Sequence, residues 1–309
     1  MANITVIDSW QYKFSQPVID YWRQQGHDVL TNINWGPSKT ETGVIYFPVV
    51  DNNLIQASRK QAPSPDRFVV AEAVDIDIYA GHLGAVNWDY VNALVFMAHH
   101  KRDLAMRKSG GKIPKDLPIY IVPGGVDTDV WTYRRDPSRG YNVAWIGRLW
   151  VAKGVFSALQ IFKQLIGTDP DNPWRLYLRA DEKFNPEWYK DHVEGYLEAN
   201  EDLKSRITWV PFQADLNEWL EEMDFILQSS YKEAYGYVVS QSAAKGIKPI
   251  VQMTAGALDT WPSSWVFHTH DEAIEMFLGS YEPETYRAYI ADMYPLSKRC
   301  KILDEICGL

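Results

Sequence analysis

Cysteine is scarce in this sequence: among 309 residues there are only Cys300 and Cys307, both within the last ten positions. We therefore expect free thiols and no disulfide framework. Long apolar runs are also missing, because no stretch approaches the roughly 18 residues that a membrane span needs. The first residues lack a basic segment followed by an apolar one, so no secretory signal is readable, and we expect a cytoplasmic location.

Two common ligand-binding patterns are absent as well. A dinucleotide fingerprint needs G-x-G-x-x-G and an acid about 20 residues further on, and neither half of the chain has one, which disfavours a dehydrogenase. No cluster of His, Cys, Asp and Glu has the spacing of a zinc site. The sequence therefore predicts neither a bound metal nor a cofactor.

Positive charge is in the minority, since 31 Lys and Arg face 40 Asp and Glu, for a net charge of −9. This balance disfavours a general nucleic-acid binder, because phosphate contacts need local positive charge. One local exception is "HHKRDLAMRKSGGKIPK" (99–115), with six basic side chains besides its two histidines. A solvated helix face is the ordinary interpretation of such a run, and a phosphate-binding patch is the alternative.

Strands and helices are predicted to alternate along most of the chain. "NITVIDS" (3–9) reads as a strand, "SQPVIDYWRQQG" (15–26) as a helix and "HDVLTNI" (27–33) as the next strand. The same rhythm restarts after the polar stretch "TYRRDPSRGYN" (132–142), which is the best linker in the sequence. We therefore expect an α/β protein of two Rossmann-like domains with doubly wound parallel sheets, 1–137 and 138–291, with a ligand cleft between them.

Two loops in the second half carry candidate chemistry. "WIGRLWVAKG" (145–154) places Arg148 and Lys153 after a strand, where two cations can neutralise a diphosphate. "KEAYGYVV" (232–239) places Glu233 before a helix whose first amides, at residues 235–237, form an anion site. Taken singly, these loops are more typical of solvated cations and of an acid that complements a helix dipole. Their joint occurrence at corresponding strand ends favours a site for a sugar linked to a diphosphate.

These two loops resemble the retaining glycosyltransferase family GT4, whose members have the GT-B fold. "VAWIGRLWVAKG" is similar to the family's G-R-x…K-G loop, and "KEAYGYVVSQSAAKGIKPIV" to its E-x-F-G…E-A-x-x-x-G-x-P-V block. The resemblance covers about residues 119–254 and is only architectural before that. It implies two Rossmann-like domains facing each other across a cleft, an acceptor-binding domain followed by a donor-binding one. It also implies that the last helix, within 292–309, crosses back to the first domain.

The resemblance also implies roles for single residues. Arg148 and Lys153 would hold the donor diphosphate and stabilise the departing nucleoside diphosphate, while Glu233 would bind hydroxyls of the donor sugar. Further donor contacts would come from Gly147, Tyr235, Gly236, Tyr237 and Gln241. The family has an acid at the last of these positions, which binds ribose, and the uncharged amide of Gln241 is a weaker acceptor. The expected substrate is a UDP- or GDP-sugar, used without a metal.

The first domain departs from the family, because "SWQYKFSQP" stands where members have a glycine-rich loop. Asp75, Asp77 and His82, which follow a predicted strand, are the acceptor-side candidates. The D-x-D pattern at 75–77 does not predict a metal site, because the same pattern recurs at 127–129 and 169–171.

The acceptor stays open among a glycan, a lipid and modified DNA. Weaker similarity to the DNA α-glucosyltransferases of T-even-type phages would give segment 99–115 a role in contacting DNA. A non-catalytic nucleotide-sugar binder is the remaining alternative.

Overall fold

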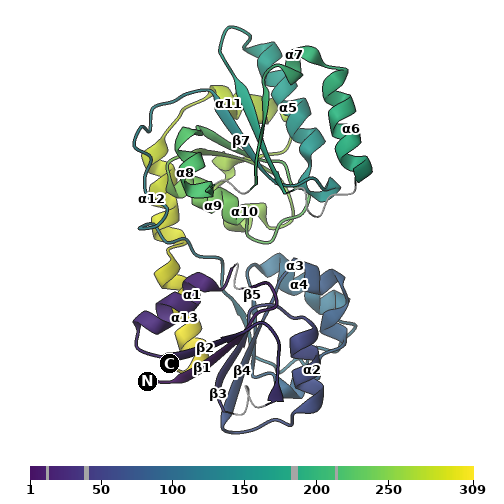
Figure 1. Cartoon of the computed structure of the whole chain (residues 1–309), viewed down its shortest axis with the longest axis vertical. Coiled ribbons are helices and arrows are strands. Elements are labelled where there is room, and N and C mark those ends of the chain that lie inside the picture. The colour runs from purple at the N-terminus through teal and green to yellow at the C-terminus, as the bar shows by residue number, and fades with distance from the viewer. Residues whose placement is uncertain (12–13, 38–41, 182–186, 213–214) are drawn as a thin grey trace. The chain divides into compact units, whose positions relative to one another are not determined.

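The structure is a computed structural model that describes residues 1–11, 14–37, 42–181, 187–212 and 215–309. The chain divides into two compact units, one formed by Met1–Asp127 with Pro295–Leu309 and the other by Thr128–Tyr294. Each unit is a parallel β-sheet with helices on both faces (Figure 1). No helix among the described residues is long and apolar enough to cross a membrane.

The first unit is built on a six-stranded sheet of order β2-β1-β3-β4-β5-β6, in which all neighbours are parallel. Its strands are β1 (Asn3–Ile7), β2 (Asp28–Asn32), β3 (Gly43–Phe47), β4 (Arg67–Ala73), β5 (Ala93–Phe96) and β6 (Ile119–Ile121). One face is covered by α2 (Asn52–Lys60), α3 (Asp75–Tyr79) and α4 (His99–Lys108), and the other by α1 (Gln16–Gln24) and α13 (Leu296–Cys307). Alternate residues of the strands feed the two apolar cores, as the pleat of a buried parallel sheet requires.

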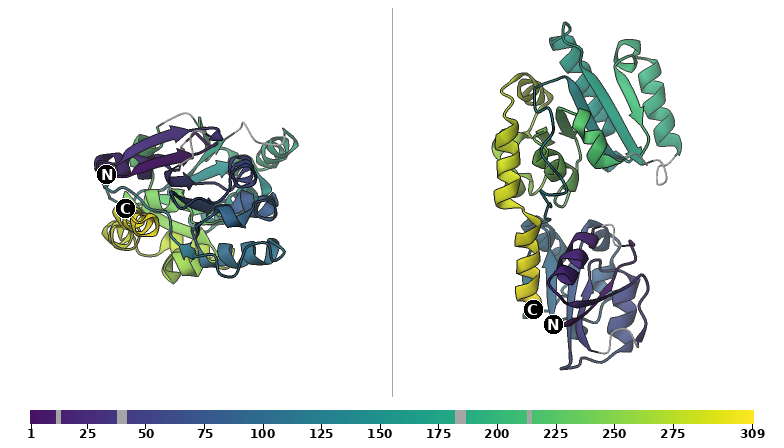
Figure 2. Two further views of the ribbon diagram at one scale, coloured as in Figure 1. Left: turned by 90° about the horizontal axis from the view of Figure 1, so that it is seen from below. Right: turned by 60° about the vertical axis from the view of Figure 1, so that its left-hand side comes forward.

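The C-terminal helix α13 is an integral part of the first unit. Leu303 and Ile306 pack into the same core as α1, and Figure 2 shows the two helices side by side. Arg299 is buried, and its Nη2 donates to both carboxylate oxygens of Glu72 of β4, at 2.9 and 2.7 Å. Its Nη1 donates to the carbonyl oxygen of Val122 at 2.9 Å, so two different partners hold α13 on the sheet.

Both cysteines lie on this helix, and both are free, as expected from the sequence. Burial raises the pKa of each thiol, Cys300 and Cys307, to about 12. Because the thiolate is the reactive form, these are packing residues of low reactivity.

The second unit repeats the architecture with the order β12-β11-β10-β7-β8-β9. Its strands are β7 (Asn142–Arg148), β8 (Arg175–Asp181), β9 (Ile207–Val210), β10 (Phe225–Gln228), β11 (Lys248–Gln252) and β12 (Val266–Phe267). Its helices are α5 (Val155–Thr168), α6 (Glu187–Glu198), α7 (Glu201–Lys204), α8 (Leu216–Trp219), α9 (Tyr237–Ala244), α10 (Ala257–Thr260), α11 (His270–Leu278) and α12 (Pro283–Met293). Helices α5, α6 and α11 pack on one face, and α8 and α9 on the other.

The polar stretch that was expected to be the linker is tied to this second unit. The guanidinium of Arg134 is buried and donates to the carboxylate of Asp224 at 3.1 Å. Arg287 of α12 donates to the carbonyl oxygens of Thr128 and Trp131 at 3.2 and 3.1 Å. The compact second unit therefore begins at Thr128, earlier in the chain than the expected boundary at 137/138.

The predicted fold class is confirmed: both halves contain parallel sheets with strands and helices in alternation. The additional elements are short or polar, among them α2, α3 and α11. Local capping supports two of them: the side chain of Asp51 accepts from the Asn53 and Leu54 amides at the start of α2, and Thr269 accepts from the Glu272 amide at the start of α11.

Candidate active site of the second unit

The carboxyl ends of β7 and β10 meet at one edge of the second sheet, because the two strands are parallel neighbours. Arg148 is the last residue of β7, follows Gly147 directly, and is exposed. Gln228 is the last residue of β10. In open α/β sheets this edge is where ligands bind, so the loops that leave these two strands define the candidate site.

An ion pair joins the two loops. The ammonium of Lys153, after β7, lies 2.7 Å from carboxylate Oε2 of Glu233, after β10. Their side chains are 29% and 26% exposed, so both groups are partly desolvated and still accessible. The structure therefore brings together Lys153 and Glu233, which are 80 residues apart in the sequence.

Gly154 makes this close approach of the loops possible. It adopts φ 65°, and a Cβ atom at this position would lie 2.0 Å from the carbonyl oxygen of Ser229. The hydroxyl of Ser229 donates to the carbonyl of Gly154 at 2.8 Å, and the amide of Tyr231 donates to the carbonyl of Ala152 at 2.9 Å. Only glycine satisfies both the left-handed backbone and the contact distance, which is the physical reason for the K-G pair in "WVAKG".

Aromatic packing fixes the start of α9. Gly236 adopts φ 84° and caps the helix, and the ring of Tyr235 before it is 2% exposed. That ring lies 5.1 Å from Tyr237, 5.6 Å from Trp261 and 5.3 Å from Tyr294. The ring of Tyr235 is therefore a buried anchor, and the amides at 235–237, predicted to bind an anion, lie directly before α9 and at its first residue.

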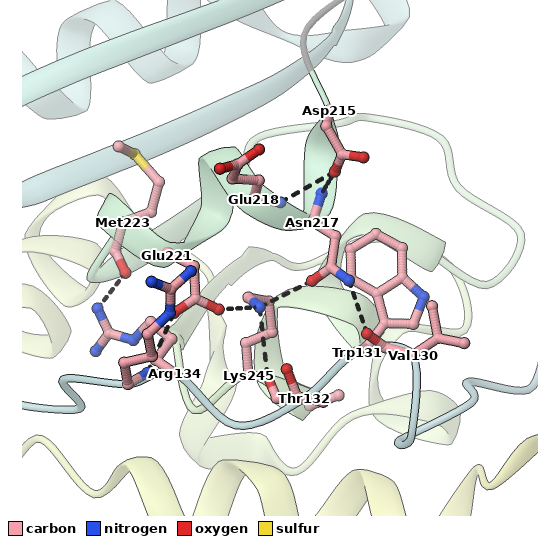
Figure 3. A network of polar contacts seen from close by, with 12 residues as sticks. Val130, Trp131, Thr132, Arg134, Asp215, Asn217, Glu218, Glu221, Met223 and Lys245 are labelled. Atoms are coloured by element: carbon pink, nitrogen blue, oxygen red, sulfur yellow. Dashed lines mark hydrogen bonds and ion pairs between the residues drawn. The ribbon is translucent and has the colours of Figure 1, made fainter.

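The other end of α9 is held by a buried lysine, shown in Figure 3. The ammonium of Lys245 forms an ion pair with Glu221 and donates to the side-chain oxygen of Asn217 at 2.8 Å and to the carbonyl of Thr132 at 3.3 Å. A buried ammonium needs its three donors satisfied, and these three acceptors do so. Both ends of α9 are thus positioned by specific contacts.

Gln241 lies one turn beyond Tyr237 on α9 and is half-buried. Its side chain makes no hydrogen bond to any residue within the described part of the chain. Gln241 therefore lies on α9, the helix whose first residues belong to the candidate site. Its expected contact with ribose stays a prediction.

Gln228 is a site residue that sequence reasoning missed. Its side-chain amide donates to Oε2 of Glu233 at 3.2 Å. The signal that could have found it is the polar residue that ends the apolar run "DFILQ", directly before the loop that carries Glu233.

The three acceptor-side candidates lie in the first unit and are engaged in contacts with the protein. Oδ2 of Asp77 accepts the amides of Val50 at 3.0 Å and Val74 at 2.9 Å, which ties the loops after β3 and β4 together. Burial raises the pKa of this carboxyl to about 8, against the lowering effect of the two amides. His82 Nδ1 lies 2.9 Å from the Val50 carbonyl oxygen, and Asp75 pairs with Lys101.

The basic segment 99–115 begins as helix α4 and is less exposed than its composition indicates. Lys101 is 4% exposed because it pairs with Asp75, and Arg102 lies 2.8 Å from Asp103. Two of its six cations therefore face carboxylates of the protein. Within the described ranges, no group of three or more His, Cys, Asp and Glu side chains is arranged to hold a metal ion.

Comparisons with known proteins match one segment of the chain to a family and the whole chain to solved structures. The profile of a family described as "Glycosyl transferases group 1" matches residues 140–273, which include both loops. This segment is therefore similar to the glycosyl transferases of group 1. A comparison with curated proteins found no match.

Solved glycosyltransferase structures resemble the whole chain. Anabaena Alr3699/HepE in complex with UDP and glucose aligns over 100% of both chains, with 13% identity and a TM-score of 0.73. A glycosyltransferase from Rickettsia africae ESF-5 aligns over 99% of this chain and 97% of its own, with 14% identity and a TM-score of 0.71. AviGT4, a glycosyltransferase involved in avilamycin A biosynthesis, aligns over 100% and 97%, with 13% identity and a TM-score of 0.64. The chain thus has the fold of the GT-B glycosyltransferases.

Proposed function

We propose that the protein is a glycosyltransferase that moves a sugar from a nucleotide-sugar donor to an acceptor hydroxyl. The observation that carries this proposal is the ion pair of Lys153 and Glu233 at 2.7 Å, beside the glycine-capped start of α9. A cation, an acid and a helix start at one strand edge suit a ligand that combines phosphate with sugar hydroxyls. The similarity of residues 140–273 to the glycosyl transferases of group 1 supports the same activity.

The chemistry divides between the two loops. The bond between the anomeric carbon and the diphosphate oxygen breaks, and its electron pair goes to the phosphate, where Arg148 and Lys153 stabilise the added negative charge. The acceptor hydroxyl attacks from the same face of the sugar and its proton passes to the departing phosphate oxygen, so the anomeric configuration is retained. Glu233 accepts hydrogen bonds from the sugar hydroxyls and orients the ring. The two cations supply the countercharge, so the proposed reaction uses no metal and no cofactor.

UDP-sugars are the proposed donors, ahead of GDP-sugars. Structures of Anabaena HepE, which has the same fold, contain UDP, UDP with glucose, or UDP-glucose. We further propose that the enzyme is similar to the GT4 family, on the basis of the two loop motifs, and that it acts in the cytoplasm, a reducing compartment that suits its two free cysteines. A glycan or lipid hydroxyl is the proposed acceptor, since the pairing of Lys101 with Asp75 gives a DNA acceptor less support.

The first test is a thermal-shift panel of UDP, GDP and their glucose and mannose conjugates. A ligand at about 100 times its dissociation constant adds about 2.7 kcal/mol to the free energy of unfolding. We expect UDP and UDP-glucose to raise the melting temperature, and no shift by any nucleotide would contradict the proposal.

The second test is turnover of UDP-glucose in the presence of EDTA, followed by NMR. Release of UDP together with α-glucose, or its transfer to an added acceptor, supports a retaining, metal-independent enzyme. Tight binding with no turnover, with or without divalent metal, would instead indicate a non-catalytic binder. Release of β-glucose would contradict retention.

A further inference from the structure

The carboxylate of Glu233 is held by two side chains of different character. Lys153 donates to Oε2 at 2.7 Å and carries a charge, whereas Gln228 donates to the same oxygen at 3.2 Å and is neutral. A carboxylate only accepts hydrogen bonds, so the amide nitrogen of Gln228 is the atom that must face it.

Gln228 is itself rigidly placed. Its backbone ends β10, in register with Val251 of β11. Its side chain lies against Gly236, where a Cβ atom would come within 3.1 Å of the amide nitrogen and 3.5 Å of the amide oxygen. The amide of Gln228 is therefore wedged between the carboxylate of Glu233 and the start of α9.

The two donors respond differently to a diphosphate. Phosphate oxygens attract the ammonium of Lys153 by charge, so a bound donor substrate competes with Glu233 for this cation. The neutral amide of Gln228 is subject to no comparable attraction. When Lys153 turns to the phosphate, the side-chain amide of Gln228 still holds Oε2 of Glu233, while the backbone amide of Ala234 donates to Oε1 at 3.3 Å.

We propose that Gln228 is a positioning residue of the sugar site: it holds the carboxylate of Glu233 toward the sugar hydroxyls while Lys153 engages the diphosphate. This inference rests on the proposed function, because it assigns Glu233 to the sugar and Lys153 to the phosphate. It predicts that Gln228 affects the sugar part of the substrate and not the nucleotide part.

The experiment compares binding of UDP and UDP-glucose to the unmodified chain and to Gln228→Met, by calorimetry. Methionine keeps the length and shape of the side chain but donates no hydrogen bond. We expect the affinity for UDP to stay within about twofold and the affinity for UDP-glucose to fall about 10-fold, the scale of one hydrogen bond to a charged group. The turnover number with UDP-glucose should fall as well.

A second variant gives a readout that a purely structural role would not produce. In Gln228→Glu, the introduced carboxylic acid can donate to Glu233 only while the pair shares a proton. We expect its affinity for UDP-glucose to approach the natural value at low pH and to fall as pH rises, relative to the natural chain. The methionine variant should show no such pH dependence.

Gln252→Met is the matched control. Gln252 is also half-buried and ends a strand, β11, but its side chain accepts from Ser157 at 3.4 Å, and among the described residues no hydrogen bond links it to Glu233. We expect it to retain the natural ratio of UDP-glucose to UDP affinity.

Unchanged UDP-glucose binding and turnover in Gln228→Met would overturn the inference, and so would an equal loss of UDP and UDP-glucose binding. If the natural chain binds no nucleotide sugar, the proposed function fails and the inference fails with it. Natural binding with an unaffected methionine variant overturns the inference alone.

Discussion

The two units place polar residues at the same edge of the same kind of sheet and use them differently. In the first unit, Asp77 binds two backbone amides, and Lys101 pairs with Asp75, with side chains 5% and 25% exposed. In the second, the side chains of Lys153 and Glu233 are 29% and 26% exposed. The two pairs differ in the cation: an accessible lysine can exchange its carboxylate for a ligand, whereas a buried one serves to hold loops together.

This difference shows why position after a strand is a weak indicator of function. Asp75, Asp77 and His82 were selected by that position alone, and each is engaged by the protein. Lys153 and Glu233 were selected by position and by a motif shared with a family. Their roles with substrate remain predictions, as does any acceptor contact by the first-unit residues.

The largest effect on turnover should follow removal of a cation from the sheet edge of the second unit. We expect Lys153→Ala and Arg148→Ala each to lower the turnover number about 100-fold or more, because each removes a preorganised charge from the leaving phosphate. Steady-state kinetics with UDP-glucose measure this. Unimpaired turnover in both variants would contradict the assignment of the site.

Lys101→Met changes the corresponding paired lysine at the sheet edge of the first unit. We expect it to lower the free energy of unfolding by about 2 kcal/mol, because it leaves a partly buried Asp75 without its cation. Affinity for UDP should be unchanged. A loss of UDP affinity in this variant would contradict the conclusion that the polar residues of the two units have different roles.

Gly154→Ala tests whether the close contact of Gly154 with the Ser229 backbone is needed to form the site in the second unit. Alanine would need a left-handed conformation and would clash with the Ser229 carbonyl, so we expect a loss of about 2 kcal/mol or more in the free energy of unfolding. Denaturant titration measures this. Gly167→Ala on the same helix, α5, has open space around its Cβ position and should stabilise by up to about 1 kcal/mol.

The pH dependence of the free energy of unfolding should report on the Asp77 carboxyl at the sheet edge of the first unit. The pKa of Asp77 is about 8 in the folded chain, raised mainly by burial, with the carboxylates of Asp51 and Glu72 adding to it. Between about pH 4 and pH 8 the folded state therefore binds a proton that the unfolded state has lost. Stability contributed by this group must fall as pH rises through that window, by up to about 1.4 kcal/mol per pH unit.

Asp77→Asn should remove that slope, because an amide accepts from Val50 and Val74 without titrating. Chemical denaturation of both proteins from pH 5 to pH 8 gives the comparison. Parallel stability curves would show that Asp77 stays ionised in the fold.

The smallest expected effect concerns Gln241. Gln241→Glu introduces a charged acceptor at the position where the resembling family has an acid, and charge-assisted hydrogen bonds are about twice as strong as neutral ones. We expect UDP affinity to rise about fivefold, measured by calorimetry. Unchanged or weaker binding would show that the helix face of Gln241 does not meet the ribose.

Much of the fold was predictable from the sequence, because buried parallel strands have short apolar sequences that glycine or proline residues separate from the neighbouring elements. The run "VAWIG" and the helix after Gly154 illustrate this, since periodicity and punctuation agree there. Helix α2 was not predictable from periodicity: it is polar over much of its length and depends on capping by Asp51 and on packing of Leu54 and Ile55.

For the site, the motif resemblance selected Lys153 and Glu233, and the structure shows how the two side chains come into contact. The approach of Lys153 to Glu233 depends on Gly154 meeting the Ser229 carbonyl, a contact between residues 75 apart. Gln228 escaped prediction because its role depends on where its side chain points, which a strand pattern does not encode. Burial of Lys101 depends equally on a partner from another loop.

The inclusion of α13 in the first unit has a consequence for biosynthesis. The second unit is one continuous segment, Thr128–Tyr294, whereas the first needs Pro295–Leu309 to complete its core. A chain emerging from the ribosome can therefore finish its second unit first, although domains generally fold in order from the N-terminus. Until α13 is synthesised, the apolar face that includes Val6, Val44 and Val95 is covered by α1 alone, and a chaperone could bind its exposed part.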